Sequence, residues 1–337
     1  MHNKNNAIVL GLKIFYQMPI RIYIFLILGL IFVSCDNDSK LENEIAKIEM
    51  PFVVERFDNA FFEAEPNDLP KLKTAYPFLF SKHVADSIWI YRINDTLQDQ
   101  LLSEVSKTYA EFKNTKEELT GLFQHLKYYD KTFSIPRVIT LTNDVAYREK
   151  SIVNDSLVLI ALDNYLGAEH EFYQNISMYI AANMEQHQIV TDVAEGYAKN
   201  YMFQTNRKTL LDEMIYFGKL LYFKDVMIPF KTDAEKIGYT EAQIKWAEVN
   251  ESPIWSYFVE KELLYSTDDK LLNRFIADAP FSKFYLEFDN ESPGRLGQYV
   301  GWQIVKAYAE TTGKDLMRIM EAKPEELFRK SKFKPKK

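Results

Sequence analysis

Cysteine is almost absent from this chain of 337 residues, because Cys35 is the single one. A chain with one cysteine forms no internal disulfide, so an exported form of it is held together by its core alone. If Cys35 is itself modified, the chain also lacks a thiol nucleophile and thiolate ligands for zinc. The sequence therefore excludes disulfide-stapled scaffolds and thiol chemistry.

The chain also lacks the short motifs that mark common enzyme sites. It contains no phosphate-binding G-x-x-x-x-G-K-[ST], no dinucleotide-binding G-x-G-x-x-G and no G-x-S-x-G nucleophile turn. None of its five histidines stands in H-E-x-x-H, the spacing that directs two imidazoles towards zinc. The nearest segment, His170-Glu-Phe-Tyr-Gln174, has a glutamine in the second position, and its alternative interpretation is the start of a surface helix. We therefore expect no metal and no cofactor.

Positive charge is outnumbered by negative charge, and glycine is scarce. The chain has 41 Lys and Arg against 48 Asp and Glu, a net charge of −7, which becomes −10 if Lys4, Lys13 and Arg21 leave with a cleaved leader. An acidic chain is a poor partner for nucleic acid or anionic lipid, so we expect neither as the main partner. The 47% hydrophobic and 26% charged residues are typical of a globular protein, and only 11 glycines favour helices with short connections.

The surroundings of Cys35 predict a lipoprotein signal peptide over residues 1–34. Arg21 supplies the positive start, residues 22–33 form a short apolar run, and the small Ser34 precedes the cysteine. The apolar run is too short for a bilayer core, which needs about 20 residues. We therefore predict that Cys35 is lipid-modified, becomes the first mature residue and anchors the protein to a membrane of the cell envelope.

The start of this leader has two interpretations. Met18 begins a cleaner signal peptide, so the natural chain is expected to start there and residues 1–17 are expected not to belong to it. The alternative is one hydrophobic anchor helix over residues 7–33, which charged and helix-breaking residues interrupt. Phe32 stands where lipoprotein signals usually have leucine. In the first interpretation, residues 35–46 are the lipidated cysteine and a polar tether.

Apolar and β-branched runs come early in the chain, and helical periodicity dominates its later part. The predicted strands are 48–57, 137–142, 147–153 and 156–162. Predicted helices fill the chain after Gly167, among them 170–183, 208–223 and 293–312. The pattern indicates an α+β fold, mostly helical, with a small N-terminal β-sheet followed by a large helical part. We expect one globular domain over residues 47–330 and a basic tail over residues 331–337.

The segment 293–312 is the most specific of these helices. Ser292 is the expected N-cap, with Pro293 in the first helical position and Gly313 as the stop. Two interior glycines, each costing about 1 kcal/mol in a helix, predict close approach of another helix or backbone. The helix is either a tightly packed core element or the wall of a substrate cleft. In both cases its key residues are Arg295, Gly297, Gly301 and Trp302.

Several blocks along the chain resemble the gliding-motility lipoprotein GldB family of Bacteroidetes. Besides the Cys35 leader, they are Glu55–Asp58, His125–Tyr129, Leu162–Gly167, Glu213–Lys219, Ala279–Ser282 and Ser292–Lys306. The resemblance implies an envelope lipoprotein that gliding requires, associated with other proteins of the type IX secretion and motility machinery. It implies no established catalytic residues.

A fainter resemblance is to a group of predicted zinc proteases. Asp212-Glu-Met-Ile-Tyr216 stands where that group has H-E-x-x-H, so Glu213 matches the general base while Asp212 and Tyr216 replace both histidines. This implies a zincin-like fold that has lost its metal site and is not an enzyme. Glu213 on an ordinary amphipathic helix is one alternative, and an envelope hydrolase of peptide or peptidoglycan is the other.

Overall fold

The computed structural model describes residues 39–202, 204, 206–286 and 289–336. It divides the chain into two compact units, residues 1–49 and residues 50–337. In the first unit the described part contains one short helix over residues 39–45. Cys35 and the predicted signal peptide lie outside the described residues, so lipidation stays a prediction.

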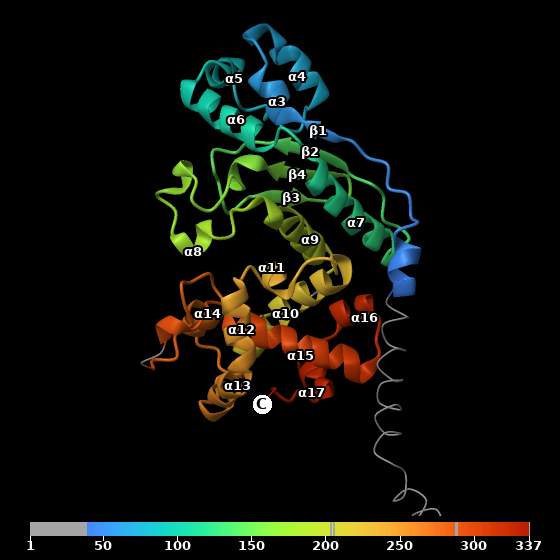
Figure 1. Cartoon of the computed structure of the whole chain (residues 1–337), viewed down its shortest axis with the longest axis vertical. Coiled ribbons are helices and arrows are strands. Elements are labelled where there is room, and N and C mark those ends of the chain that lie inside the picture. The colour runs from blue at the N-terminus through green and yellow to red at the C-terminus, as the bar shows by residue number, and fades with distance from the viewer. Residues whose placement is uncertain (1–38, 203, 205, 287–288, 337) are drawn as a thin grey trace, which may run out of the picture. The chain divides into compact units, whose positions relative to one another are not determined.

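A small mixed sheet forms the centre of the second unit (Figure 1). Its strand order is β1-β2-β4-β3, with parallel pairing of β1 to β2 and of β2 to β4, and antiparallel pairing of β3 to β4. Val138 lies opposite Val54 on one side and Val158 on the other. The strands are β1 (Val54–Arg56), β2 (Arg137–Leu141), β3 (Ser151–Val153) and β4 (Leu157–Ala161).

Helices α7 and α9 pack with this sheet through one buried cluster. Leu122 and Phe123 of α7 meet Val138 and Val158 of the sheet and Val193 of α9. Short 3₁₀ turns and one short helix connect β4 to α9. The elements are α7 (Lys113–Tyr129), η2 (Leu162–Asn164), η3 (Glu171–Tyr173), α8 (Met178–Ala181), η4 (Gln186–Gln188) and α9 (Ile189–Asn200).

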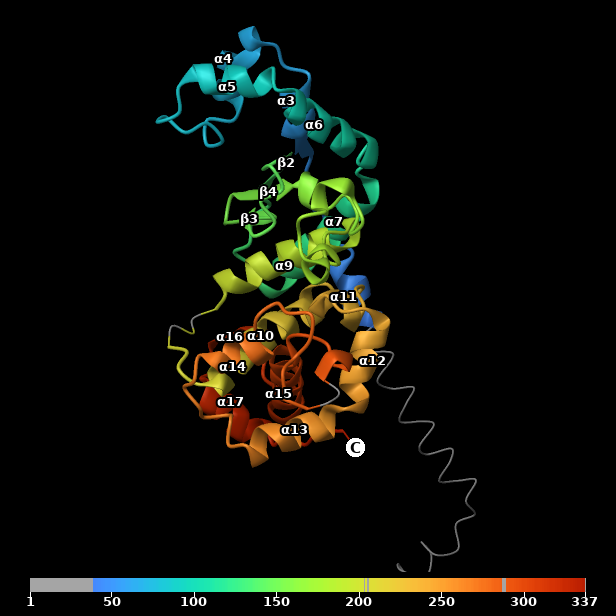
Figure 2. The same ribbon diagram turned by 90° about the vertical axis from the view of Figure 1, so that its left-hand side faces the viewer.

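An N-terminal group of helices lies at one end of the unit in both views (Figures 1 and 2). It has its own small core around Phe61, Leu72 and Phe80. Its elements are α3 (Phe57–Phe62), η1 (Pro66–Asp68), α4 (Leu69–Ala75), α5 (Asp86–Ile93) and α6 (Thr96–Thr108).

The C-terminal helices fill the other end around a second large core, which includes Met214, Phe258, Val300 and Trp302. The closest crossing joins α10 and α15. A Cβ on Gly301 would lie 1.8 Å from the Met214 oxygen, and one on Gly218 would lie 2.4 Å from the Gly301 carbonyl. The elements are α10 (Leu210–Met227), α11 (Asp233–Ile237), α12 (Glu241–Val249), α13 (Glu251–Glu260), α14 (Lys270–Phe275), η5 (Asp289–Glu291), α15 (Leu296–Thr312), α16 (Leu316–Glu321) and α17 (Pro324–Ser331).

The predicted fold class, a mostly helical α+β protein with a small sheet before a large helical part, is confirmed. Several local predictions are wrong. Pro293 is not in the first helical position, because α15 begins at Leu296, and the strand predicted over 48–57 pairs only over Val54–Arg56. The segment 170–183 is not one helix but the short turns η3 and α8. Ser292 does not cap α15, because its hydroxyl donates to the Ser282 and Asp289 carbonyls while the Ser282 hydroxyl accepts the Leu296 N–H. Arg295, in a left-handed conformation, occupies the N-cap position instead.

Candidate functional site: a polar cleft

A polar cleft of about 510 Å³ is formed jointly by α8, α9, α10, α11, the segment after α14, the start of α15 and the loop before β3. Its lining is rich in charged groups contributed by all of these segments except α8. The charged lining residues are Arg148, Lys150, Asp192, Glu195, Lys224, Lys236, Asp278 and Arg295. Most are held by partners of opposite charge, which fixes their positions.

Lys150 and Asp192 join the sheet side of the cleft to α9. The Lys150 Nζ lies 2.6 Å from the Asp192 carboxylate, and its charge faces the Tyr165 ring with 5.4 Å to the centroid. The buried Tyr165 hydroxyl donates to the same carboxylate over 2.9 Å. Burial, followed by the charge of Asp192, raises the pKa of Tyr165 well above its usual range, so the phenol stays a donor.

Glu195 is the second carboxylate that α9 presents to the cleft. The buried Lys224 of α10 binds it over 2.8 Å and Lys199 over 3.0 Å. Although burial opposes ionisation, the charges of Lys224 and Lys199 hold the pKa of Glu195 well below its usual range. Lys224 also donates to the Lys236 carbonyl over 3.1 Å, which ties α10 to α11.

Lys236 connects the cleft, through Asp225, to Trp302, one of the key residues predicted for the helix over 293–312. Its Nζ lies 3.0 Å from Asp225, which also accepts the Trp302 indole N–H over 2.6 Å. Lys306 covers the Trp302 ring at 3.8 Å from the centroid. Burial raises the pKa of Asp225 despite both lysines, so their charges compensate only part of its desolvation.

Arg295 stands at the entrance to α15 in a strained backbone conformation, with φ of 59°. Its guanidinium donates to the Gly238 carbonyl over 2.9 Å and lies 5.5 Å from the centroid of the Tyr239 ring. Its ion-pair partner is Asp278, at 3.6 Å, whose side chain is 70% exposed. A positive φ costs free energy in a residue other than glycine, and such residues concentrate at functional positions. Arg295 is therefore the strongest candidate for a functional residue in this lining.

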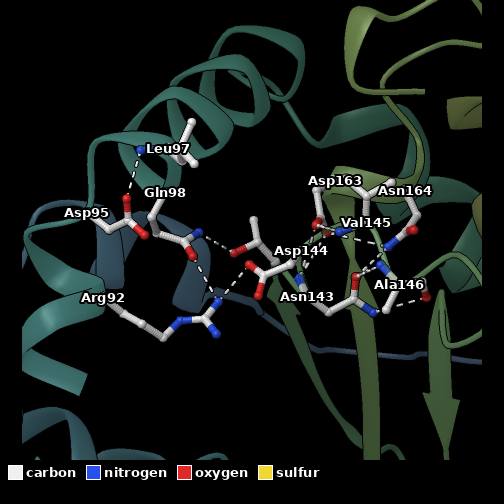
Figure 3. Close-up of polar contacts among 11 residues, drawn as sticks. Arg92, Asp95, Leu97, Gln98, Asn143, Asp144, Val145, Ala146, Asp163 and Asn164 are labelled. Atoms are coloured by element: carbon white, nitrogen blue, oxygen red, sulfur yellow. Dashed lines mark hydrogen bonds and ion pairs between the residues drawn. The ribbon is translucent and has the colours of Figure 1, made fainter. Parts of the chain in front are cut away.

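A second polar cluster lies at the carboxyl ends of β2 and β4 (Figure 3). The fully buried Asp163 accepts the Asn143 N–H and the Val145 N–H, the latter over 2.7 Å. Burial raises the pKa of Asp163 to about 6. The turn that donates to it is strained, with φ of 58° at Asp144 and 56° at Val145. Asp163 thus holds a turn that a β-branched residue resists.

The three residues aligned with a lost zinc motif have other local partners. Asp212 caps α10 by accepting the Thr209 N–H over 2.9 Å. Glu213 pairs with Arg207 over 3.2 Å, and the Arg207 guanidinium lies 4.0 Å from the centroid of the Tyr216 ring. Burial raises the pKa of Glu213. Within the described part of the chain, no three His, Cys, Asp or Glu side chains gather as a metal site.

Asp212 also lines a second cavity of about 460 Å³ together with Lys219. Lys219 is 1% exposed, and its ammonium donates to the Met320 and Ala322 carbonyls over 3.0 and 2.5 Å. Burial lowers its pKa to about 8. The contacts attach α10 to the end of α16, which gives this lysine a structural explanation.

The structure divides the predicted helix residues between packing and the cleft. Gly297 approaches Phe275 and Ile276, and Gly301 approaches α10, so the predicted close backbone approach is confirmed. Trp302 is fully buried, while Arg295 lines the cleft. The packing interpretation therefore fits Gly297, Gly301 and Trp302, and a substrate-binding role of the cleft that Arg295 lines stays a prediction.

A family model for the gliding motility protein GldB matches residues 38–335. The match covers nearly the whole chain and both polar clusters. The chain belongs to the GldB family. This family is that of a gliding-motility component and not of a known enzyme, and it implies association with the cell envelope. Neither a curated protein nor a solved structure matches the chain. Among the described residues of this GldB family member, no helix combines the length and apolar content that crossing a bilayer requires.

Most cleft residues were missed from the sequence, because Lys150, the α9 pair Asp192 and Glu195, and Lys236 come from three separate segments that share no motif. One signal was available. Lys219 and Lys224 interrupt the otherwise apolar buried surface of α10, and lysine is rarely buried without a specific partner.

Proposed function

We propose that this protein is a membrane-anchored lipoprotein of the gliding-motility and type IX secretion machinery, acting through protein interactions and not through catalysis. The observation that carries the proposal is the GldB family match over residues 38–335. The sequence around Cys35 supports the anchor, because a small residue, a cysteine and a polar stretch follow a short apolar run.

The Cys35→Ala variant tests the anchor. We expect it to leave the membrane fraction, because the lipid would be the main attachment of an acidic chain. The measurement is fractionation of cells followed by immunoblotting, with palmitate labelling of the wild type. A variant that stays in the membrane fraction after salt and carbonate washes contradicts the anchor.

Deletion of the gene in a gliding bacterium that carries it tests the machinery role. We expect loss of surface gliding and of type IX secretion, restored by the wild-type gene. Glu213→Gln serves as the matched variant for the peptidase hypothesis, and we expect it to restore gliding fully. A deletion strain that glides and secretes normally contradicts the proposal. No feature of the described residues favours the peptidase alternative.

A further inference from the structure

The polar cleft has an excess of positive charge in an otherwise acidic protein. Its lining includes five basic and three acidic residues, whereas the whole chain has a net charge of −7. Because a concave site with low-dielectric walls concentrates its own field, this local sign matters more than the net charge of the molecule.

The lysines of the cleft are already neutralised. Lys150, Lys224 and Lys236 have carboxylate partners at 2.6, 2.8 and 3.0 Å. The carboxylates of Asp192 and Glu195 are used in these pairs, so they repel an incoming anion weakly. The remaining acid, Asp278, is largely solvated.

The positive charges of two arginines in the lining are not neutralised by a closely bound carboxylate. Arg148 is exposed, and among the described residues no carboxylate lies within ion-pair distance of it. Arg295 has Asp278 at 3.6 Å, beyond hydrogen-bond distance, and its side chain is 19% exposed. Both line the same cavity.

The structure holds Arg295 in position before any ligand arrives. The Gly238 carbonyl takes one of its N–H groups, and the Tyr239 ring lies beside the guanidinium. The positive φ of Arg295 places it at the N-terminal end of the 17-residue α15, where the helix dipole adds positive potential. A fixed guanidinium loses little freedom on binding.

We propose that this cleft binds an oxoanion, a carboxylate or a phosphate group, with Arg295 as its main contact and Arg148 as the second. The planar fork of an arginine matches the two oxygens of either group through paired N–H donors. A volume of about 510 Å³ accommodates a ligand larger than the anion itself, such as the end of a peptide or a phosphorylated small molecule. This inference goes beyond the motility role and is tested without it.

Calorimetric titration of the purified protein at low salt tests the proposal with two probes. One is inorganic phosphate, and the other is an acetylated tripeptide with a free C-terminal carboxylate, compared with its amide. Saturable binding of phosphate alone identifies a phosphate site, and binding of the free peptide but not its amide identifies a carboxylate site. Saturable binding of neither probe overturns the proposal.

Variants locate the binding in the cleft. Arg295→Gln is expected to weaken binding about tenfold or more, and Arg295→Lys to restore only part of it, since a lysine keeps the charge but loses the fork. Because Arg295 also contacts Gly238, the exposed Arg148→Gln provides an independent variant with an expected loss of several-fold. Arg318→Gln, at a 69% exposed side chain outside the cleft, is the matched control. Equal affinity of wild type, Arg148→Gln and Arg318→Gln overturns the proposal.

Discussion

Asp163 shows how one buried carboxylate organises its surroundings. Its oxygens accept backbone N–H groups from a strained turn, and Asn164 beside it donates to Asn143 over 2.7 Å. The sequence marks both residues only as part of a family block. Burial and partners depend on where the strand ends meet, and the spacing of residues does not reveal that.

Asp163 is expected to make stability fall as pH rises. Its pKa is about 6 in the folded protein against about 3.9 when unfolded, so the folded state binds more protons between these values. Its contribution is therefore complete below about pH 4 and lost above about pH 6. The free energy of unfolding should decrease by about 2–3 kcal/mol from this group, as measured by urea denaturation from pH 4 to pH 7.

Asp163→Asn is the control for this prediction, because an amide does not titrate. From pH 4 to pH 7 the wild type should therefore lose about 2–3 kcal/mol of unfolding free energy more than the variant does. The variant should also be less stable at pH 4, by about 1–3 kcal/mol, since its NH₂ group fixes two donors against the backbone N–H groups, whereas the protonated carboxyl has one, which either oxygen can carry. A difference that is constant with pH contradicts the assigned titration.

At the scale of elements, the crossing of α10 and α15 depends on two glycines. At Gly218 and Gly301 the two backbones lie so close together that a Cβ on either residue would overlap the other helix. The sequence predicted such an approach for α15 because interior glycines weaken a helix and need a packing reason. It did not identify α10 as the partner, since periodicity describes one helix at a time.

Gly301→Ala should destabilise the protein by about 3 kcal/mol or more, because the added methyl meets the Met214 carbonyl, a backbone atom that cannot rotate away. Chemical denaturation followed by circular dichroism measures this. Gly313→Asn is the matched control. Gly313 also has positive φ but open space around it, and asparagine tolerates that conformation, so the loss should stay below about 1 kcal/mol. Equal losses in both variants contradict the close-crossing explanation.

The strand predictions succeeded where β-branched runs were bounded by turn residues, as in β2 and β4. They overextended β1, which pairs only over Val54–Arg56 although the pattern suggested residues 48–57. The prediction of Ser292 as the N-cap of α15 was wrong for a different reason. Ser292 is a good cap by type, yet its hydroxyl serves two loop carbonyls, and tertiary contacts override local preference.

At the scale of the whole molecule, the cleft could not be read from the sequence. Arg295 was identified through its helix, but its charged neighbours come from separate segments spread over residues 148–278. Only the folded topology brings them together. Family resemblance, by contrast, was predictable because it depends on ordered blocks rather than on contacts.

The C-terminal tail is integrated with the helical end. Phe333 packs edge-on against Trp255 with ring centroids 5.2 Å apart, and the Lys336 N–H donates to the buried Glu251 over 2.8 Å. Deleting residues 331–337 should therefore lower the free energy of unfolding by about 1–3 kcal/mol. Thermal denaturation and the tryptophan emission maximum, expected to shift to the red, measure this.

The matched control is the double variant Lys334→Gln and Lys336→Gln, which removes two charges but keeps the ring and the backbone donor. It should leave the melting temperature unchanged, whereas Phe333→Ala should reproduce much of the deletion. If the double variant is as unstable as the deletion, charge and not packing attaches the tail.

The position of β1 at the edge of the sheet has a mechanical consequence. Tension that enters the unit from its N-terminal side acts first on the packing of Phe52 against Phe123, whose ring centroids lie 5.2 Å apart, and then on this three-residue strand. Side chains reinforce the pairing of β1 with β2. Arg137 donates two hydrogen bonds to the Glu55 carboxylate, over 2.9 and 2.8 Å, and Arg56 donates to the Tyr109 carbonyl over 2.7 Å. These two arginines, more than the length of the strand, would set the load at which the sheet begins to open.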